Sequence, residues 1–136
     1  MSTLNVGTIK SVTSNTPPAF QDSGGTVAGQ LCRASIRFSQ QGTQSIQSSF
    51  NVSSITDEGT GNTTVNFTNV IRNDAGTESS NYAVVNGQDG TAVSTSHLMM
   101  FVHGTPTSSE VPLIFFNIDN SGLRADAAMA MTAIFC

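Results

Sequence analysis

Residues 45–70 read SIQSSFNVSSITDEGTGNTTVNFTNV and have the pattern of a β-hairpin. The first half, residues 45–55, is predicted to form one extended strand. Ile46, Phe50 and Val52 lie in one register, and Ile55 falls on the opposite face. Residues 56–62 contain two glycines and two adjacent acids, a composition typical of a hairpin loop. Residues 63–70 return with Val65 and Phe67 inward, so we expect two antiparallel strands.

Alternation of apolar and polar side chains predicts further strands on both sides of this hairpin. Residues 31–38 are a half-buried strand with four residues on one face, Cys32, Ala34, Ile36 and Phe38, and residues 39–44 are a turn. Residues 81–87 are a short strand that carries the only tyrosine, and residues 87–90 are a turn.

Two later segments are apolar on both faces. Residues 95–103 are therefore expected to be mostly covered on both sides of the strand. Residues 111–117, VPLIFFN, are predicted to be the most buried strand, with Pro112 near its start or at an edge.

The C-terminal segment, residues 123–135, is compatible with two structures. Its alanines and methionines favour a helix. Its apolar residues also fit a period of two: Leu123, Ala125, Ala127, Met129, Met131, Ala133 and Phe135. We favour the strand, because no charge follows Ala127 and no helix stop signal is present.

Composition supports an all-β fold. Ser, Thr, Asn and Gln make up 53 of the 136 residues, which disfavours helices and suits short strands with tight turns. We expect one antiparallel β-sandwich or jelly-roll-like domain over residues 31–136. Residues 1–30 contain a Pro pair and a Gly pair, so we expect an extended N-terminal arm that reaches on the order of 100 Å. Its candidate docking residues are Pro17, Pro18 and Phe20.

Charge and hydropathy argue against several classes of protein. The net charge is −4 and Lys and Arg do not cluster, which is unfavourable for nucleic-acid binding. No run of 18 apolar residues is present, and residues 1–10 lack the pattern of a secretory signal. We therefore expect no nucleic-acid partner and no membrane insertion.

The sequence offers little for catalysis, and we expect no enzyme activity, no cofactor and no metal. His97 and His103 would stand about 20 Å apart in one strand, too far to share a metal ion within one chain. The alternative is a metal site in a trimer, formed by three equivalent histidines around the threefold axis. No nucleophile elbow, phosphate loop, dinucleotide fingerprint or zinc-protease motif occurs.

The acidic residues and the cysteines each admit a second interpretation. A glycan depolymerase would need carboxylates assembled between subunits, such as Asp57, Glu58, Asp89 and Glu110. Cys32 and Cys136 are expected to be buried and reduced, although a bridge between them would form in an oxidising compartment.

Four segments of the chain resemble a family of small virion proteins of tailed bacteriophages, many of them marine. They are MSTLNVGTIKSV (1–12), TPPAFQDSGGTVAGQLCRASIRF (16–38), SSFNVSSITDEGTGNTTVNFTNV (48–70) and NYAVV (81–85). The resemblance covers residues 1 to about 85 and implies a structural protein of the particle, tail-fibre-like and homotrimeric. Relatives commonly have an aromatic residue in an Asn-rich strand where this chain has SIRFS (35–39), so details of that surface do not transfer.

We therefore expect a homotrimeric virion protein, made in the bacterial cytoplasm and released by lysis. As a tail-fibre-like appendage it would attach to a host surface glycan or protein through distal loops, with three copies multiplying the affinity. The candidate recognition residues are Asn86, Gly87, Gln88, Asp89, Thr105 and Ser108. The alternative is a capsid decoration protein whose arm and one flat face clamp other virion proteins. The number of copies per particle distinguishes the two functions, because a decoration protein is present in far more copies than a tail fibre.

Overall fold

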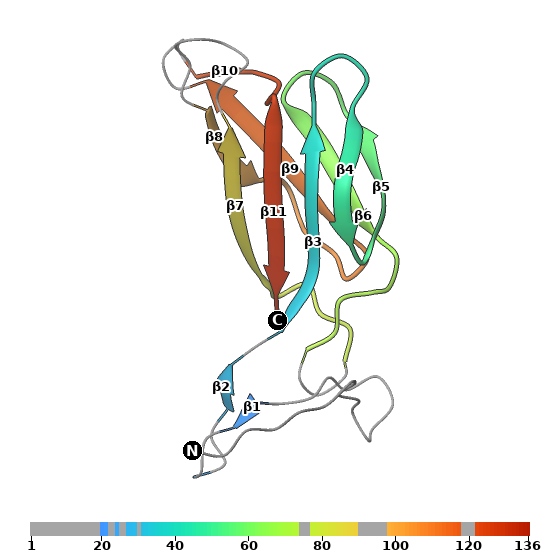
Figure 1. Cartoon of the computed structure of the whole chain (residues 1–136), viewed down its shortest axis with the longest axis vertical. Coiled ribbons are helices and arrows are strands. Elements are labelled where there is room, and N and C mark those ends of the chain that lie inside the picture. Colours follow the sequence, from blue (N-terminus) through green and yellow to red (C-terminus); the bar gives the residue numbers. More distant parts are fainter. Residues whose placement is uncertain are drawn as a thin grey trace.

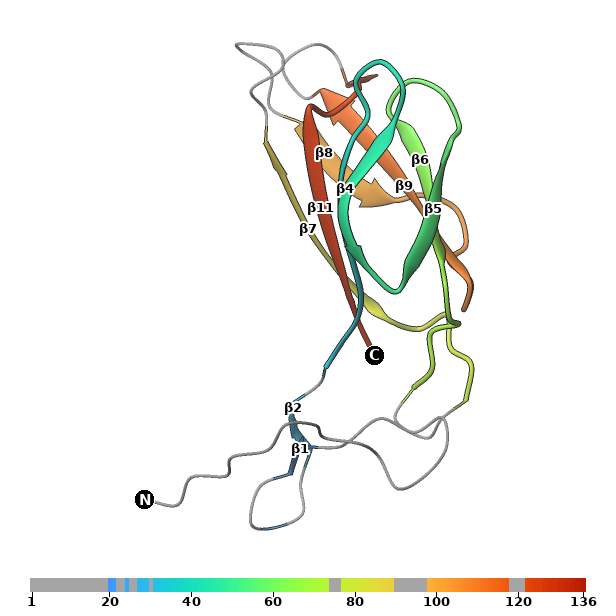
Figure 2. The same cartoon turned by 45° about the vertical axis from the view of Figure 1, so that its right-hand side comes forward.

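The computed structural model describes residues 20–21, 24, 27–29, 31–73, 77–89, 98–117 and 122–136, with the backbone alone at 20–21, 27–29 and 88–89. These residues form eleven β-strands and no helix. Two antiparallel sheets face each other (Figure 1, Figure 2). The predicted all-β sandwich is confirmed. Among the residues described, no helix is long and apolar enough to span a bilayer.

The first sheet has four strands. Their spatial order is β4 (Ser45–Phe50), β3 (Cys32–Ser39), β11 (Met129–Phe135) and β7 (Ala83–Asp89). β3 and β4 form a hairpin, and β11 lies between β3 and β7 and pairs with both. The chain therefore ends in a central strand, which confirms the strand that we favoured for the C-terminal segment.

The second sheet is built around β9 (Glu110–Asn117). β8 (Leu98–Val102) pairs with one side of β9 and β6 (Asn62–Phe67) with the other. β5 (Val52–Asp57) follows β6 at the edge, and β10 (Leu123–Arg124) pairs with the end of β9. The β5–β6 pair confirms the hairpin predicted from the sequence.

Pro112 lies near the start of β9, as predicted. Its carbonyl oxygen accepts a hydrogen bond from the backbone nitrogen of His103 at 2.9 Å, so this side of Pro112 faces the end of β8. The ladder between β8 and β9 begins at Leu113. The missing N–H of proline therefore costs no bond to β6.

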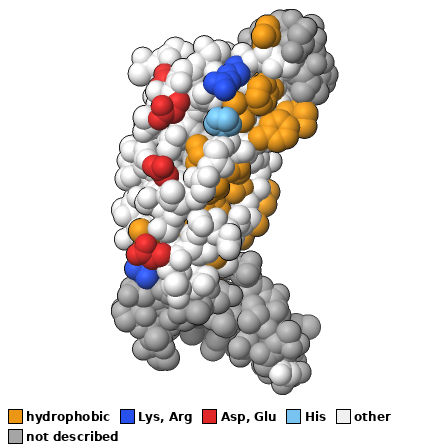
Figure 3. Space-filling view, turned by 180° about the vertical axis from the view of Figure 1, so that it is seen from behind, with side chains coloured by type: hydrophobic (Ala, Val, Ile, Leu, Met, Phe, Trp, Pro, Cys, Tyr) orange, Lys and Arg blue, Asp and Glu red, His pale blue; other side chains and the backbone are white. Residues whose placement is uncertain are grey.

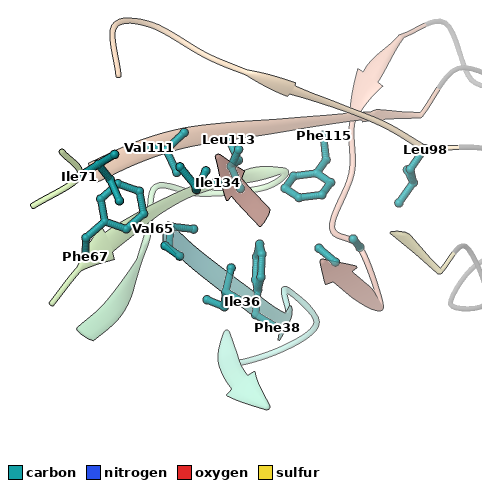
Figure 4. Close-up of a cluster of buried hydrophobic side chains, with 13 residues drawn as sticks. Ile36, Phe38, Val65, Phe67, Ile71, Leu98, Val111, Leu113, Phe115 and Ile134 are labelled. Atoms are coloured by element: carbon teal, nitrogen blue, oxygen red, sulfur yellow. The ribbon is translucent and has the colours of Figure 1, made fainter. Parts of the chain in front are cut away.

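The core lies between the two sheets and contains alternate residues of the facing strands (Figure 4). β3 contributes Ala34, Ile36 and Phe38, and β9 contributes Val111, Leu113 and Phe115. Phe38 and Phe115 meet edge to face across the sandwich, with ring centroids 6.2 Å apart. The predicted inward face of β3 and the predicted burial of β9 are confirmed for these residues.

The single strand predicted over residues 45–55 is wrong. The segment forms two strands in different sheets, β4 and β5, and the chain crosses between them at Asn51 (Figure 2). Asn51 has a φ of 54°, a left-handed conformation that interrupts an extended strand. Because β4 is an edge strand, all six of its residues are exposed, including Ile46 and Phe50.

The turn predicted at residues 87–90 is wrong over its described part. Gly87, Gln88 and Asp89 belong to β7, because they pair with the first three residues of β11. Pairing with a central strand overrides the turn preference of this Gly- and Asp-containing segment.

Two predictions about strand faces are also wrong. The continuous strand predicted over residues 123–135 is divided into β10 and β11, and the core side of β11 carries Ala130, Thr132 and Ile134. Residues 95–103 are not covered on both faces of the described strand β8. Leu98, Met100 and Val102 pack on the core, whereas Met99 and Phe101 are each 44% exposed.

Most of the predicted N-terminal arm lies outside the described residues, including Pro17 and Pro18. Within it, β1 (Phe20–Gln21) pairs antiparallel with β2 (Val27–Gly29). Figure 1 shows this pair outside the sandwich, next to the end at which β3 begins. The docking role of the arm stays a prediction.

Candidate functional site

Metal-ligating side chains do not form a cluster in the described part of the chain. No three His, Cys, Asp or Glu side chains there could hold a metal ion. His103 is exposed after β8, and His97 lies outside the described residues. Asp57 pairs with the start of β6, and Glu110 pairs with Asn66 near its end. The hairpin acids Asp57 and Glu58 are therefore not brought together with Glu110 within one subunit.

The predicted recognition residues do not form one surface. Asn86 and Gly87 lie within β7, and Asp89 ends that strand opposite Met129. Thr105 and Ser108 lie in the β8–β9 loop, which is tied to the other end of β7 through Tyr82. Seven residues of strand span roughly 20 Å, so the two predicted loops lie toward opposite ends of the sandwich.

Tyr82 is the centre of a hydrogen-bonded corner between β7 and the β8–β9 loop. Its hydroxyl lies 3.1 Å from the backbone oxygen of Thr107 and 2.9 Å from that of Glu110, and these two acceptors share its single hydrogen. Its ring packs edge to face on Phe67, with centroids 6.2 Å apart. Burial, together with the nearby charge of Glu110, raises the pKa of Tyr82 to about 12. In the same loop, the Ser108 hydroxyl donates to the carboxylate of Glu78 at 3.2 Å. This loop is therefore part of the framework of the fold.

The outer face of the four-stranded sheet, which we call the β11 face, carries exposed apolar side chains together with serines and the exposed Arg37. One row of directly opposed residues crosses all four strands: Phe50, Ser35, Ala133 and Val85. Phe50 and Val85 are each 58% exposed, and Met131 in the next row is 45% exposed. A shallow depression of about 450 Å³ lies over β11 and its neighbours. The Nε atom of Arg37, an exposed residue on this face, lies 3.1 Å from the sulfur of Met129.

The outer face of the five-stranded sheet combines apolar and polar side chains, and we call it the β9 face. Alternation along β9 turns Pro112, Ile114 and Phe116 away from the core. Phe101 of β8 packs on Phe116, with ring centroids 6.1 Å apart. Figure 3 shows hydrophobic side chains gathered beside a histidine on this side of the molecule. A depression of about 320 Å³ here is lined by Glu58, Asn62, Thr63, Thr64, His103, Pro112 and Leu113.

Cys32 and Cys136 are free thiols, and both are half-buried, not buried as predicted. Cys32 follows a register shift at the end of the β3–β11 ladder, which leaves it less covered than Ala34. The sulfur of Cys136 lies 3.4 Å from the backbone oxygen of Asn81.

No protein-family model matches this sequence, and searches of curated proteins and of solved structures find no significant match.

Sequence reasoning missed both outer faces. The available signal was the apolar character of both sides of residues 95–103 and 111–117, which we interpreted as burial, and the apolar residues on both sides of 129–135. In a two-layer sandwich one side of every strand lies outside the core, so an apolar outer side marks a surface that a partner can cover.

Proposed function

We propose that this chain is a structural protein of a phage particle, assembled as a homotrimer into a tail-fibre-like surface appendage. The resemblance of residues 1–85 to small virion proteins supports the class and the trimer. The β11 face is the structural observation that carries the assembly.

The β11 face has the properties of a surface that another subunit covers. Phe50, Val85 and Met131 are among the most exposed large apolar side chains described, and they lie on one side of one sheet. Four strands at the usual spacing make this face about 14 Å wide. Large apolar patches are uncommon on monomeric proteins, and burial of apolar area contributes roughly 25 cal/mol per Å².

A closed ring of copies is one way in which such a face can be covered. A contact between two different surfaces, repeated around a rotation axis, gives a closed ring. The row through Phe50, Ser35, Ala133 and Val85 carries no charge, so copies that meet along this row bring no like charges of the row together, whereas Arg37 lies in the next row. The resemblance to a trimeric family supplies the number of copies.

The oligomeric state tests the assembly. We expect light scattering to give three times the subunit mass of 14.2 kDa. Val85→Lys should convert the trimer to monomers, because it places a charge in the row of exposed apolar residues. Leu123→Lys is the matched control, because Leu123 is 60% exposed on β10 of the other sheet. A monomeric unmodified chain, or a trimer that survives Val85→Lys, contradicts this assembly.

The place on the particle tests the function. We expect a reconstruction of the phage that encodes this chain to show threefold density at the tail. Copies spread over the capsid lattice would favour the decoration alternative instead. Particles that lack the chain altogether would refute both forms of the proposal.

A further inference from the structure

We propose that the depression of the β9 face binds one neutral sugar residue of a surface glycan. This inference rests on the proposed function, because an exposed appendage that attaches to a host needs a ligand of this kind. The site is distinct from the loops that the sequence predicted, and it lies on the other sheet from the β11 face.

Three adjacent strands position the site. Asn62 of β6, Ile114 of β9 and Phe101 of β8 lie directly opposite one another in one row. In the next row Thr64 lies opposite Pro112, whose carbonyl oxygen bonds to the backbone of His103. Ile114 is only 3% exposed although it points away from the core. The row is therefore closely packed. Asn62, Thr64 and Pro112 are held on strands, whereas Glu58 and His103 directly follow the ends of β5 and β8.

The polar side of the depression suits the hydroxyl groups of a sugar. Glu58 supplies a carboxylate acceptor, and Asn62, Thr64 and His103 supply groups that donate or accept. The side-chain oxygen of Asn62 is buried and accepts no hydrogen bond from the protein. Buried acceptors nearly always have a donor. A ligand hydroxyl is a donor of the kind that this oxygen lacks, and the Asn62 side chain must turn toward the depression for the two to meet.

The apolar lining of the depression is Pro112 and Leu113, and the ring of Phe101 lies in the neighbouring row, two residues before His103. This ring is 44% exposed, and its contact with Phe116 fixes its orientation. An exposed aromatic ring beside hydrogen-bonding groups matches the two surfaces of a pyranose, which carries C–H groups on its face and hydroxyl groups at its rim. The depression of about 320 Å³ is at the small end of ligand sites, so it fits a single sugar residue.

Charge favours a neutral ligand. The residues that line the depression include the carboxylate of Glu58 and no Lys or Arg. A phosphate or sulfate group in the depression would therefore meet the negative charge of Glu58, while Arg124, opposite Phe116 on the same face, lies outside the lining. The polar lining also makes this depression a poor match for an apolar face of a second copy, in contrast to the β11 face.

Binding can be measured on the full chain with defined soluble oligosaccharides. The probes are trisaccharides that end in glucose, galactose, mannose or N-acetylglucosamine, and sulfated or phosphorylated forms of each. Amide chemical shifts in a ¹⁵N-resolved NMR titration locate the contact. Soluble monovalent probes report the affinity of one subunit, without the increase that three linked copies give on a surface. We expect a neutral probe to shift the amides of Asn62, Thr64 and His103.

Variants separate the sugar site from a general surface effect. Phe101→Ala and Glu58→Gln should each weaken binding of the neutral probe by about tenfold or more, while the spectrum of the fold is retained. Leu31→Ala is the control, because it shortens an exposed apolar side chain that precedes β3 and belongs to neither proposed face, and it should leave the affinity per subunit unchanged.

The outcomes are distinct. Failure of every neutral probe to bind, binding of the anionic probes alone, or shifts confined to the β8–β9 loop would overturn this inference. Loss of the trimer in Phe101→Ala without change in sugar affinity would do the same and would make the β9 face a subunit contact. If the chain lies on the particle and no sugar binds, the sugar site is refuted and the proposed function stands. If a sugar binds and the chain is absent from the particle, the sugar site stands and the proposed function is refuted.

Discussion

The backbone nitrogen of Gln40 donates to the carbonyl oxygen of Ala127 at 3.0 Å, and the nitrogen of Ala127 donates back to the side-chain Oε1 of Gln40 at 2.8 Å. The Nε2 of the same amide donates to the Thr63 hydroxyl at 2.9 Å. Thr63 belongs to β6, so one amide connects the end of β3, the segment before β11 and the opposite sheet. Gln40 is 1% exposed, which makes these bonds part of the core.

Gln40→Ala should therefore destabilise the fold. The substitution leaves the backbone nitrogen of Ala127 and the hydroxyl of Thr63 without this partner in a buried place, and we expect a loss of about 2 to 4 kcal/mol in the free energy of unfolding. Gln41→Ala is the control, because Gln41 is exposed, and it should change stability by less than about 0.5 kcal/mol. Urea denaturation measures both. Equal effects of the two substitutions would show that the buried amide has no special role.

Gly61 cannot accept a side chain without a shift of the backbone. Its φ is +66°, and an added Cβ would lie 2.7 Å from the oxygen of Phe115 and 2.9 Å from the nitrogen of Ala125. We expect Gly61→Ala to cost about 1 to 3 kcal/mol more than Gly42→Ala in urea denaturation. Gly42 has nearly the same φ, +65°, with nothing within 4 Å of an added Cβ, so the difference isolates the close approach. The explanation fails if the two variants are equally stable.

Asn51 stabilises the point at which the chain crosses between sheets. Its Nδ2 donates to the carbonyl oxygens of Arg33 at 3.0 Å and Asn69 at 3.1 Å, and its Oδ1 accepts from the nitrogen of Asn69 at 2.8 Å. Asn51→Gly should lose these bonds at a cost of about 1 to 3 kcal/mol. Asn51→Ala should cost about 1 kcal/mol more, because alanine also disfavours the φ of 54°. Thermal unfolding of both variants tests this order, and the reverse order would refute it.

How far the sequence predicts this fold depends on whether the two faces of a strand differ. In β3, Ala34, Ile36 and Phe38 alternate with Ser35 and Arg37, so the core side could be identified from the pattern alone. In β11 both sides are apolar, and a period of two cannot choose between them. The choice is made by pairing, because Thr132 and Ile134 lie opposite Ile36 and Ala34.

The candidate sites were harder to predict for a related reason. The β9 face joins Asn62, Ile114 and Phe101, which are separated by long stretches of chain and meet only through sheet register. Residues 86–89 of the predicted loop at 86–90 are strand, because they pair with β11, and their role in recognition stays a prediction. Local composition reports on turns, whereas these surfaces are formed by long-range pairing.

Tyr82 should make the stability of the fold depend on pH in the alkaline range. Its folded pKa of about 12 lies above the value of about 10 expected in the unfolded chain, so the unfolded state loses its proton first. The stabilisation is therefore complete below pH 10 and decreases as the pH rises from 10 toward 12. The chain has one tyrosine and no tryptophan, so tyrosinate absorbance follows this group directly. We expect the midpoint of the tyrosinate titration to lie near pH 12 in buffer and near pH 10 in concentrated urea.

Tyr82→Phe should be less stable than the unmodified chain at pH 8, by roughly 1 kcal/mol in the free energy of unfolding, and this difference should narrow above pH 10. A native midpoint near 10, or a gap that stays constant with pH, would show that the hydroxyl is not held by Thr107 and Glu110 in solution.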